Sequence, residues 1–171
     1  MAKHIEFRHG GRLHFFTLAT YKRLPILVDN KDAALEGWRA VSDETGMELI
    51  CWAILPNHLH VIIDTNFNSM SKLSHAFKLA SAKLFHVERV SHRKTLWESS
   101  GWDQPLTSKE DLERHIDFVH YNPVKHGLAS SPWEYQHSSF REFVKHGYYF
   151  KDWTIDSDRR QSLRELDDTD V

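Results

Sequence analysis

Two apolar segments, residues 47–54 and 58–64, lie so close in the sequence that they constrain the fold more than any other feature. Both are rich in β-branched and aromatic residues, which favour strands. The residues between them include Pro56 and Asn57, which favour a tight connection. Two strands joined so closely pair with each other as an antiparallel hairpin. The chain is therefore expected to fold around an antiparallel sheet.

Segments on either side of this hairpin alternate between strand and helix patterns. Residues 13–20 follow a glycine pair and are typical of a strand. A helix of about 15 residues is expected between a cap at Asp29 and a stop at Gly46. Residues 69–90 carry apolar side chains at spacings of three and four, which predicts a long amphipathic helix. Residues 96–106 are expected to contain a short strand.

A last helix is expected to begin at Ser108, where Asp111 completes a capping box, and to end or kink at Pro123. The order of these elements matches an α+β fold of the split βαβ, ferredoxin-like kind. Such a fold has an antiparallel sheet with its helices on one face, and the last helix is an extra C-terminal element. The other face of the sheet is then free to carry a site.

Length and charge suggest one domain followed by an acidic tail. A chain of 171 residues fits one domain with a full hydrophobic core, which we assign to residues 1–150. Residues 151–171 are expected to form an acidic C-terminal tail that is partly disordered. Within it, residues 152–171 carry seven acidic residues and three arginines, a net charge of −4, whereas the whole chain carries −2. The remainder carries +2, the difference between these values, which permits nucleic-acid binding without proving it.

The sequence contains no apolar run long enough for a membrane span and no secretory leader, so no membrane partner is expected. Its one cysteine, Cys51, lies in an apolar run and is interpreted as a buried thiol of a reducing cytoplasm.

The tripeptide His58-Leu59-His60 is the most informative for chemistry. Side chains alternate across a strand, so the two imidazoles point to one side and Leu59 to the other. Two imidazoles on a rigid strand can supply two nitrogen ligands to one divalent metal, and Asp64, Asn57 or a neighbouring element could complete the shell. The spacing alone is weak support among 13 histidines, and two solvated surface imidazoles are the alternative.

Two blocks of the sequence stand out together. Residues 55–62 read Leu-Pro-Asn-His-Leu-His-Val-Ile, and residues 115–128 read His-Ile-Asp-Phe-Val-His-Tyr-Asn-Pro-Val-Lys-His-Gly-Leu. In this order they resemble a known family, the REP-associated tyrosine transposases, which are domesticated relatives of the bacterial single-tyrosine HUH transposases. The strand at Phe15 to Leu18 and the tract Leu96-Trp97-Glu98 are also similar to that family. The resemblance covers about residues 10–150.

The resemblance implies a ferredoxin-like domain that cuts and rejoins single-stranded DNA at palindromic, REP-like hairpins in a bacterial cytoplasm, near the nucleoid. It implies that His58, His60 and Asn122 hold Mg²⁺ or Mn²⁺, with no nucleotide cofactor. The metal polarises the phosphoryl group, and a tyrosine of the late helix forms a 5′-phosphotyrosine bond that conserves the energy for religation. A monomer is expected for this group.

The position of the nucleophile departs from the family. In the family it lies four residues before the asparagine of Asn-Pro, which here is Phe118, on one helix face with Asn122. Phe118 has no hydroxyl group, so the chain is expected to be cleavage-silent. It could be a deliberate Tyr→Phe variant or a natural member that has lost cleavage. Alternatively Tyr121 could serve as nucleophile, although its i+4 partner is Lys125, which loses the pairing with the metal.

Single strands bind in cationic grooves that carry aromatic platforms. The candidates for DNA contact lie near the first strand, on the long helix and near the proposed site: Arg12, Lys22, Arg23, Lys78, Lys83, Arg114, Lys125 and His126. Two other functions stay open, a non-cleaving DNA-hairpin-binding protein and a metallohydrolase that uses an activated water without a covalent step.

Overall fold

A computed structural model of the chain describes residues 12–85, 95–164 and 166. The elements in chain order are β1 (Leu13–Ala19), the short 3-10 helix η1 (Tyr21–Arg23), α1 (Lys31–Thr45), β2 (Glu48–Ile54), β3 (His58–Asp64), α2 (Met70–Leu84), β4 (Trp102–Pro105), α3 (Lys109–Lys125), α4 (Phe140–Lys145) and α5 (Ser157–Arg164).

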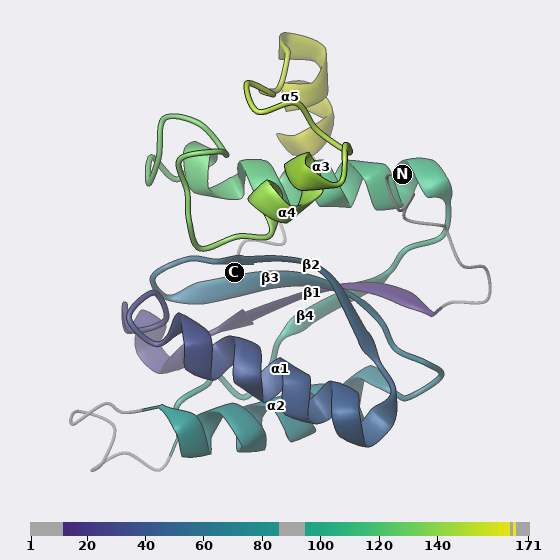
Figure 1. Cartoon of the computed structure of the whole chain (residues 1–171). Helices are drawn as coiled ribbons and strands as arrows, with labels where there is room; N and C mark the ends of the chain where they lie inside the picture. The colour runs from purple at the N-terminus through teal and green to yellow at the C-terminus, as the bar shows by residue number, and fades with distance from the viewer. Residues whose placement is uncertain (1–11, 86–94, 165, 167–171) are drawn as a thin grey trace.

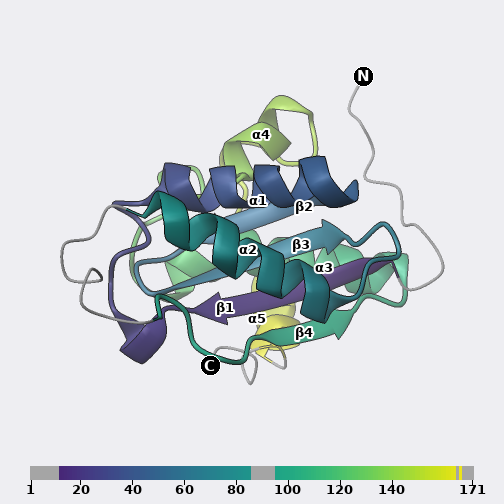
Figure 2. The same cartoon turned by 90° about the horizontal axis from the view of Figure 1, so that it is seen from below.

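The strands form one sheet in the order β2-β3-β1-β4, with every neighbouring pair antiparallel. Figure 1 shows α1 and α2 on one face of this sheet and α3 and α4 on the other, with α5 beyond α3. Figure 2, seen from the side of α1 and α2, shows these two helices lying over the strands. The predicted ferredoxin-like class, with an extra helix in the C-terminal part, is confirmed.

The face that α1 and α2 cover is apolar. Trp38 of α1 stacks on Phe77 of α2, with ring centroids 4.1 Å apart, and both side chains are buried. Leu59, Val61 and Ile63, which alternate with the histidines along β3, belong to this core. The predicted direction of these three side chains is therefore confirmed.

The face under α3 contains a second hydrophobic core that extends across residue 150. Tyr149, Ile155 and Leu163 all belong to it, together with side chains of β1 and α3 such as Phe15 and Ile116. The segment expected as a solvated tail thus includes a helix, α5, that packs through Leu163 onto the rest of the protein. Residues 167–171 lie outside the described part of the chain.

The ends of α1 and α2 differ in part from those expected. Helix α1 begins at Lys31 behind Asn30, not Asp29. Asn30 makes no side-chain capping bond, and its amide nitrogen donates to the carbonyl of Ile26. The helix stops at Gly46 as predicted, where φ of +71° suits glycine. Helix α2 ends at Leu84, and the last residues of the predicted helix lie outside the described part.

Helix α3 starts as predicted, because Ser108 Oγ accepts a hydrogen bond from the Asp111 amide. It continues past Pro123 to Lys125, so the proline does not end the helix where the sequence placed the stop. Pro123 lies in the last turn, where its missing N–H removes one bond only. The chain then turns away at Gly127, whose φ is +69°. Among the described residues, no helix is long and apolar enough to cross a membrane.

Candidate functional site

Strand β3 places His58 and His60 on the face that α3 covers. The two rings lie 4.9 Å apart between centroids, and both side chains are buried. Their common direction is as the alternation predicts. That face is not open to solvent, however, because α3 packs over β2 and β3. The pair therefore lies at an interface between sheet and helix.

Each imidazole is held through its Nδ1 atom by a polar neighbour. Asn57 Oδ1 lies 2.8 Å from His58 Nδ1, and Thr17 Oγ1 of β1 lies 2.7 Å from His60 Nδ1. An amide oxygen only accepts, so His58 Nδ1 carries the proton and Nε2 keeps the lone pair. Second partners of this kind fix the orientation of histidines that act as ligands.

Phe118 of α3 lies against His60. Its ring centroid is 5.4 Å from that of His60 and 5.7 Å from that of Phe15. The side chain is 2 % exposed and belongs to the core under α3. Phe118 is therefore both a core residue and the residue of α3 that faces His60.

Asn122 lies on the same stripe of α3, between two residues that touch the histidines. Phe118 contacts His60, and the ring of His126 lies 5.4 Å from that of His58. Residues four apart share one helix face, so residues 118, 122 and 126 form one line along the pair. Asn122 is buried, which puts its amide at the interface with β3.

Charged ligands are scarce near the pair. Among the described residues, no group of three or more His, Cys, Asp and Glu side chains is placed to hold a metal ion. Asp64 forms an ion pair with Arg12, with Arg12 Nε 2.9 Å from Asp64 Oδ1, at the opposite end of β3 from His58. The candidate donors around the pair are the imidazoles of His58 and His60, the nearby ring of His126 and the Asn122 amide.

Tyr121, the alternative nucleophile, is half-buried and packs against the core under α3. It is three residues from Phe118, which rotates it away from the line of residues 118, 122 and 126. His115, one turn before Phe118, packs on Phe15 with centroids 5.0 Å apart, and its Nδ1 donates to the carbonyl of Asp111. Burial lowers the pKa of His115, against the opposing effect of Asp111.

Several basic candidates lie around the pair. Lys125 Nζ is 5.6 Å from the centre of the Phe118 ring, and Arg114, one turn before Phe118, pairs with Asp111 at 3.3 Å. Lys22 and Arg23 follow β1 at the end where Ala19 pairs with His58.

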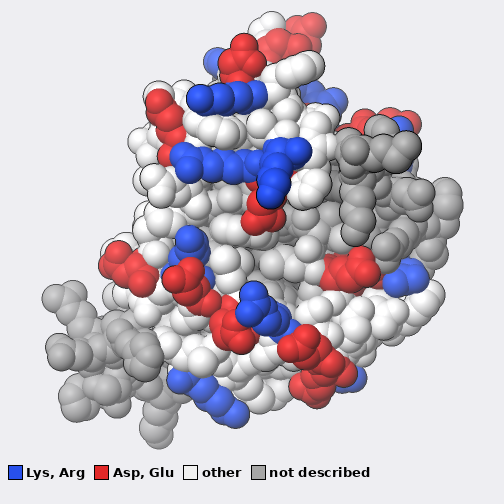
Figure 3. All heavy atoms as spheres, in the orientation of Figure 1, with Lys and Arg blue, Asp and Glu red and all other residues white. Residues whose placement is uncertain are grey.

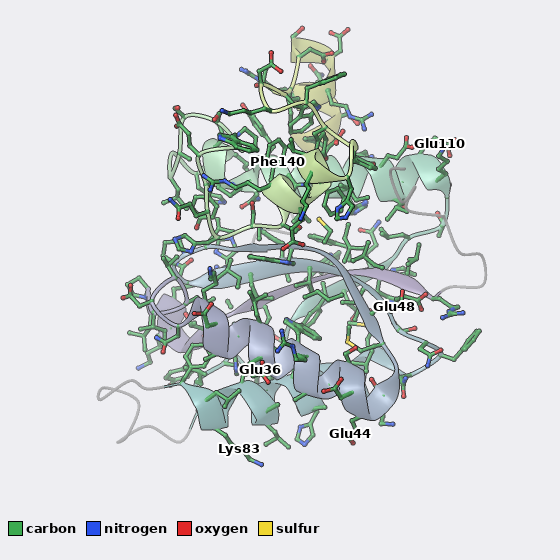
Figure 4. The ribbon with its side chains drawn as sticks, in the orientation of Figure 1. Glu36, Glu44, Glu48, Lys83, Glu110 and Phe140 are labelled. Atoms are coloured by element: carbon green, nitrogen blue, oxygen red, sulfur yellow. The ribbon has the colours of Figure 1, made fainter. Side chains whose placement is uncertain are left out.

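Three other basic candidates lie away from the pair. Arg12 is held by Asp64 at the far end of β3. Lys78 and Lys83 are on α2, across the sheet, and Figure 4 shows Lys83 pointing away from it. Lys78 Nζ donates to the carbonyls of Glu98 and Ser99, and burial lowers its pKa. On the face drawn in Figure 3, basic and acidic side chains are interspersed.

A buried polar network behind α3 was not predicted from the sequence. His120 Nε2 lies 2.9 Å from Ser139 Oγ and 3.5 Å from the sulfur of Cys51, which is buried as predicted. Burial lowers the pKa of His120 to about 3. Tyr149 donates to Asp117 Oδ1 at 2.7 Å, and its hydroxyl lies 3.4 Å from His120 Nδ1. From the sequence, the helical spacing of α3 indicated only that Asp117 and His120 lie on one helix. The residues that contact them come from distant segments.

Asp117 also binds the C-terminal helix. Arg159 of α5 donates through Nε and Nη2 to Asp117 Oδ2, at 2.8 and 2.6 Å. This two-nitrogen contact joins the end of the chain to the helix that carries Phe118 and Asn122.

Known proteins share this fold and sequence. A family model described as transposase IS200-like matches residues 8–119. A Haemophilus influenzae protein, provisionally named a REP-associated tyrosine transposase, is 27 % identical over 162 residues, covering 86 % of this chain and 90 % of that protein. The REP-associated tyrosine transposase of Escherichia coli K12 is 25 % identical over 167 residues, covering 91 % and 93 %.

A solved structure of a REP-associated tyrosine transposase bound to a REP hairpin superposes with a TM-score of 0.75 at 23 % identity, covering 91 % of this chain and 93 % of that one. It shows that the two chains share a fold. The resemblance drawn from the two sequence blocks is confirmed by these relatives. Since the family model covers more than half of the residues, this chain belongs to the IS200-like transposase family.

Proposed function

We propose that this chain binds single-stranded DNA that folds into REP-like hairpins, and that it does so without forming a covalent bond to the DNA. The observation that carries the proposal is the contact of Phe118 with His60, with ring centroids 5.4 Å apart. A residue at this position faces the histidine pair, where a tyrosine hydroxyl would meet a bound phosphate. Phenylalanine offers no oxygen there, so the site is built for binding and lacks the nucleophile.

The residues present fit a divalent cation such as Mn²⁺ or Mg²⁺. His58 and His60 have Nδ1 engaged, so each can present Nε2, and the Asn122 amide can add an oxygen. Mixed imidazole and neutral oxygen donors suit such cations, and the lack of a carboxylate among these three donors predicts modest affinity. When bound, the cation would polarise the phosphoryl group and offset its charge. Thr17 and Asn57 would hold the two rings in place.

The DNA strand would cross the surface beside the end of α3. Lys125 and Arg114 lie on either side of Phe118 along the helix, and Lys22 and Arg23 lie at the His58 end of the sheet. These cations are suited to phosphate contacts, which position a strand without reading its sequence. The related structure, which holds a REP hairpin, supports a hairpin as the partner. We keep the expectation of a monomer as a proposal.

The proposal is tested by comparing the chain with Phe118→Tyr. Both are incubated with single-stranded palindromic DNA from beside the parent gene and with Mn²⁺ or Mg²⁺, and adducts are sought on a denaturing gel. We expect an adduct in Phe118→Tyr alone. There the phenolic oxygen of the introduced tyrosine bonds to phosphorus, the bond from phosphorus to the 3′ oxygen breaks, and that oxygen leaves as a 3′-OH.

Two further variants separate the alternatives. Adding His60→Ala to Phe118→Tyr should abolish the adduct, which ties the chemistry to the histidine pair. An adduct in the chain as given that disappears in Tyr121→Phe would assign the nucleophile to Tyr121 and overturn the proposal. Tight hairpin binding with no adduct in any variant would place the loss of cleavage outside position 118.

A further inference from the structure

Trp102 on β4 is a large aromatic side chain that the fold leaves exposed. It is 43 % exposed, whereas Trp38 and Trp97 are 1 % and 3 % exposed in the core under α1 and α2. Trp38 and Trp97 each pack on Phe77, while none of the ring contacts among the described residues involves Trp102. Tryptophan is enriched at interfaces, because its ring is apolar and its N–H is polar.

The sheet places Trp102 in line with the histidine pair. In the strand register, Thr17 is opposite His60 on one side and opposite Trp102 on the other. Residues opposite each other point to the same face, so Trp102 lies on the face of His60, one strand beyond Thr17. Adjacent strands are about 4.8 Å apart, so the backbones at 60 and 102 are on the order of 10 Å apart.

Helix α3 covers His60, whereas Trp102 lies on the edge strand and is partly open to solvent. Helix α3 packs over β2 and β3, whereas β4 is the opposite edge of the sheet. Gln104, two residues along β4, shares the face of Trp102 and is half-buried. The edge therefore presents a flat ring with an amide beside it, next to a site that faces α3.

The chemistry of this edge favours a nucleobase as the occupant. Every base has a π face that can stack on an indole, and the amide of Gln104 can both donate to and accept from the edge of a base. A second copy of the chain is a poorer fit as a strand partner, because β4 is short and carries Asp103 and Pro105, features that oppose edge-to-edge pairing.

We propose that Trp102 is a stacking platform for the nucleobase next to the phosphate at the His58–His60 site. This inference rests on the proposed function, because it needs a single strand to cross the site. A strand whose phosphate lies at His60 and whose next base turns towards β4 reaches the indole directly. Trp102 would thereby hold a base, whereas the basic side chains around Phe118 are suited to contacts with phosphates.

The test uses the full chain and a set of hairpin oligonucleotides with single-stranded flanks, each carrying 2-aminopurine at a different flank position. Binding is followed by fluorescence in EDTA, so that the signal does not depend on cleavage. Stacking on an indole quenches 2-aminopurine, so the chain should quench one position more than its neighbours. Trp102→Ala should lose that quenching and weaken binding about 5- to 100-fold, while Trp102→Phe should keep most of both.

Phe150→Ala serves as the matched control, because Phe150 is 83 % exposed and lies on the segment after α4. It should bind and quench as the unmodified chain does. If Trp102→Ala also behaves so, Trp102 is no platform, and the inference fails while the proposed function stands. If the unmodified chain binds no hairpin, both fail. Light scattering that finds a dimer in the unmodified chain and a monomer in Trp102→Ala, with quenching unchanged, would assign the edge to self-association.

Discussion

The two faces of the sheet both carry an apolar core, but they differ in how many polar side chains they bury. Under α1 and α2 the contacts are between apolar rings and aliphatic side chains, as in the stack of Trp38 on Phe77. Under α3 many of the buried side chains are polar, among them His58, His60, His115, Asp117, His120 and Asn122. Burying polar groups costs free energy unless each is bonded, whereas burying apolar area is favourable. Both faces therefore hold apolar cores that stabilise the fold, and the second also buries the bonded polar side chains of the site.

The largest expected effect tests the apolar face. Trp38→Ala removes a buried ring that stacks at 4.1 Å on Phe77, and it should lower the free energy of unfolding by about 3–5 kcal/mol. Urea unfolding followed by circular dichroism measures this change. Trp102→Ala is the control, since an exposed tryptophan should cost less than about 1 kcal/mol. If both variants lose the same free energy of unfolding, the buried Trp38 does not stabilise the apolar face more than the exposed Trp102 stabilises the sheet edge.

A divalent cation should stabilise the folded protein through the face under α3, which holds His58 and His60. A cation at one hundred times its dissociation constant stabilises the folded state by about 2.7 kcal/mol, so Mn²⁺ should raise the Tm of the unmodified chain. His60→Ala should lose most of that shift. His75→Ala, which removes an exposed histidine of α2 across the sheet, should keep it. A shift that survives in His60→Ala would place the cation elsewhere.

Local sequence patterns predicted one part of this comparison well. Strand alternation places His58 and His60 together and sends Leu59 to the other face, and helical spacing aligns Phe118 with Asn122. These relations depend only on residues a few positions apart, because the geometry of a strand or helix fixes them. The resemblance then named the family, which no local pattern could have done.

Relations between distant segments could not be predicted in this way. The support of His60 by Thr17 depends on which strands pair, and the contact of Asp117 with Arg159 depends on where the C-terminal segment folds back. A charge count made that segment look like a solvated tail because it ignores Leu163, which the core buries. The same limit applies to Lys78, since a basic helix face does not indicate which side of the sheet the helix covers.

The pH dependence of stability gives a further test of the face under α3. Burial lowers the pKa of His120 to about 3, while an unfolded histidine titrates near 6.5. The unfolded chain therefore binds the proton first as the pH falls, and stability is lost from about pH 6.5 downward. Between pH 7 and pH 5 this one group should cost about 2 kcal/mol.

His120→Gln removes the titrating ring and keeps a donor near Ser139 Oγ. The Tm of this variant should fall less between pH 7 and pH 5 than that of the unmodified chain, as differential scanning calorimetry can measure. If His120→Gln and the unmodified chain lose stability in parallel, the acid sensitivity arises from other groups on the face under α3.

The smallest expected effect concerns the ion pair between Arg159 of α5 and Asp117 of α3. Arg159→Ala removes the cation beside the buried Asp117 carboxylate and leaves its contact with Tyr149, so it should destabilise the protein by about 1–2 kcal/mol, reduced because Arg159 is 40 % exposed. Arg160→Ala removes an exposed arginine of the same helix and should change little. Adding Asp117→Asn to Arg159→Ala should restore part of the loss, because a neutral amide needs no cation. If the double variant is instead less stable than Arg159→Ala alone, the carboxylate of Asp117 stabilises the protein mainly through its contact with Tyr149. Its ion pair with Arg159 of α5 would then contribute little.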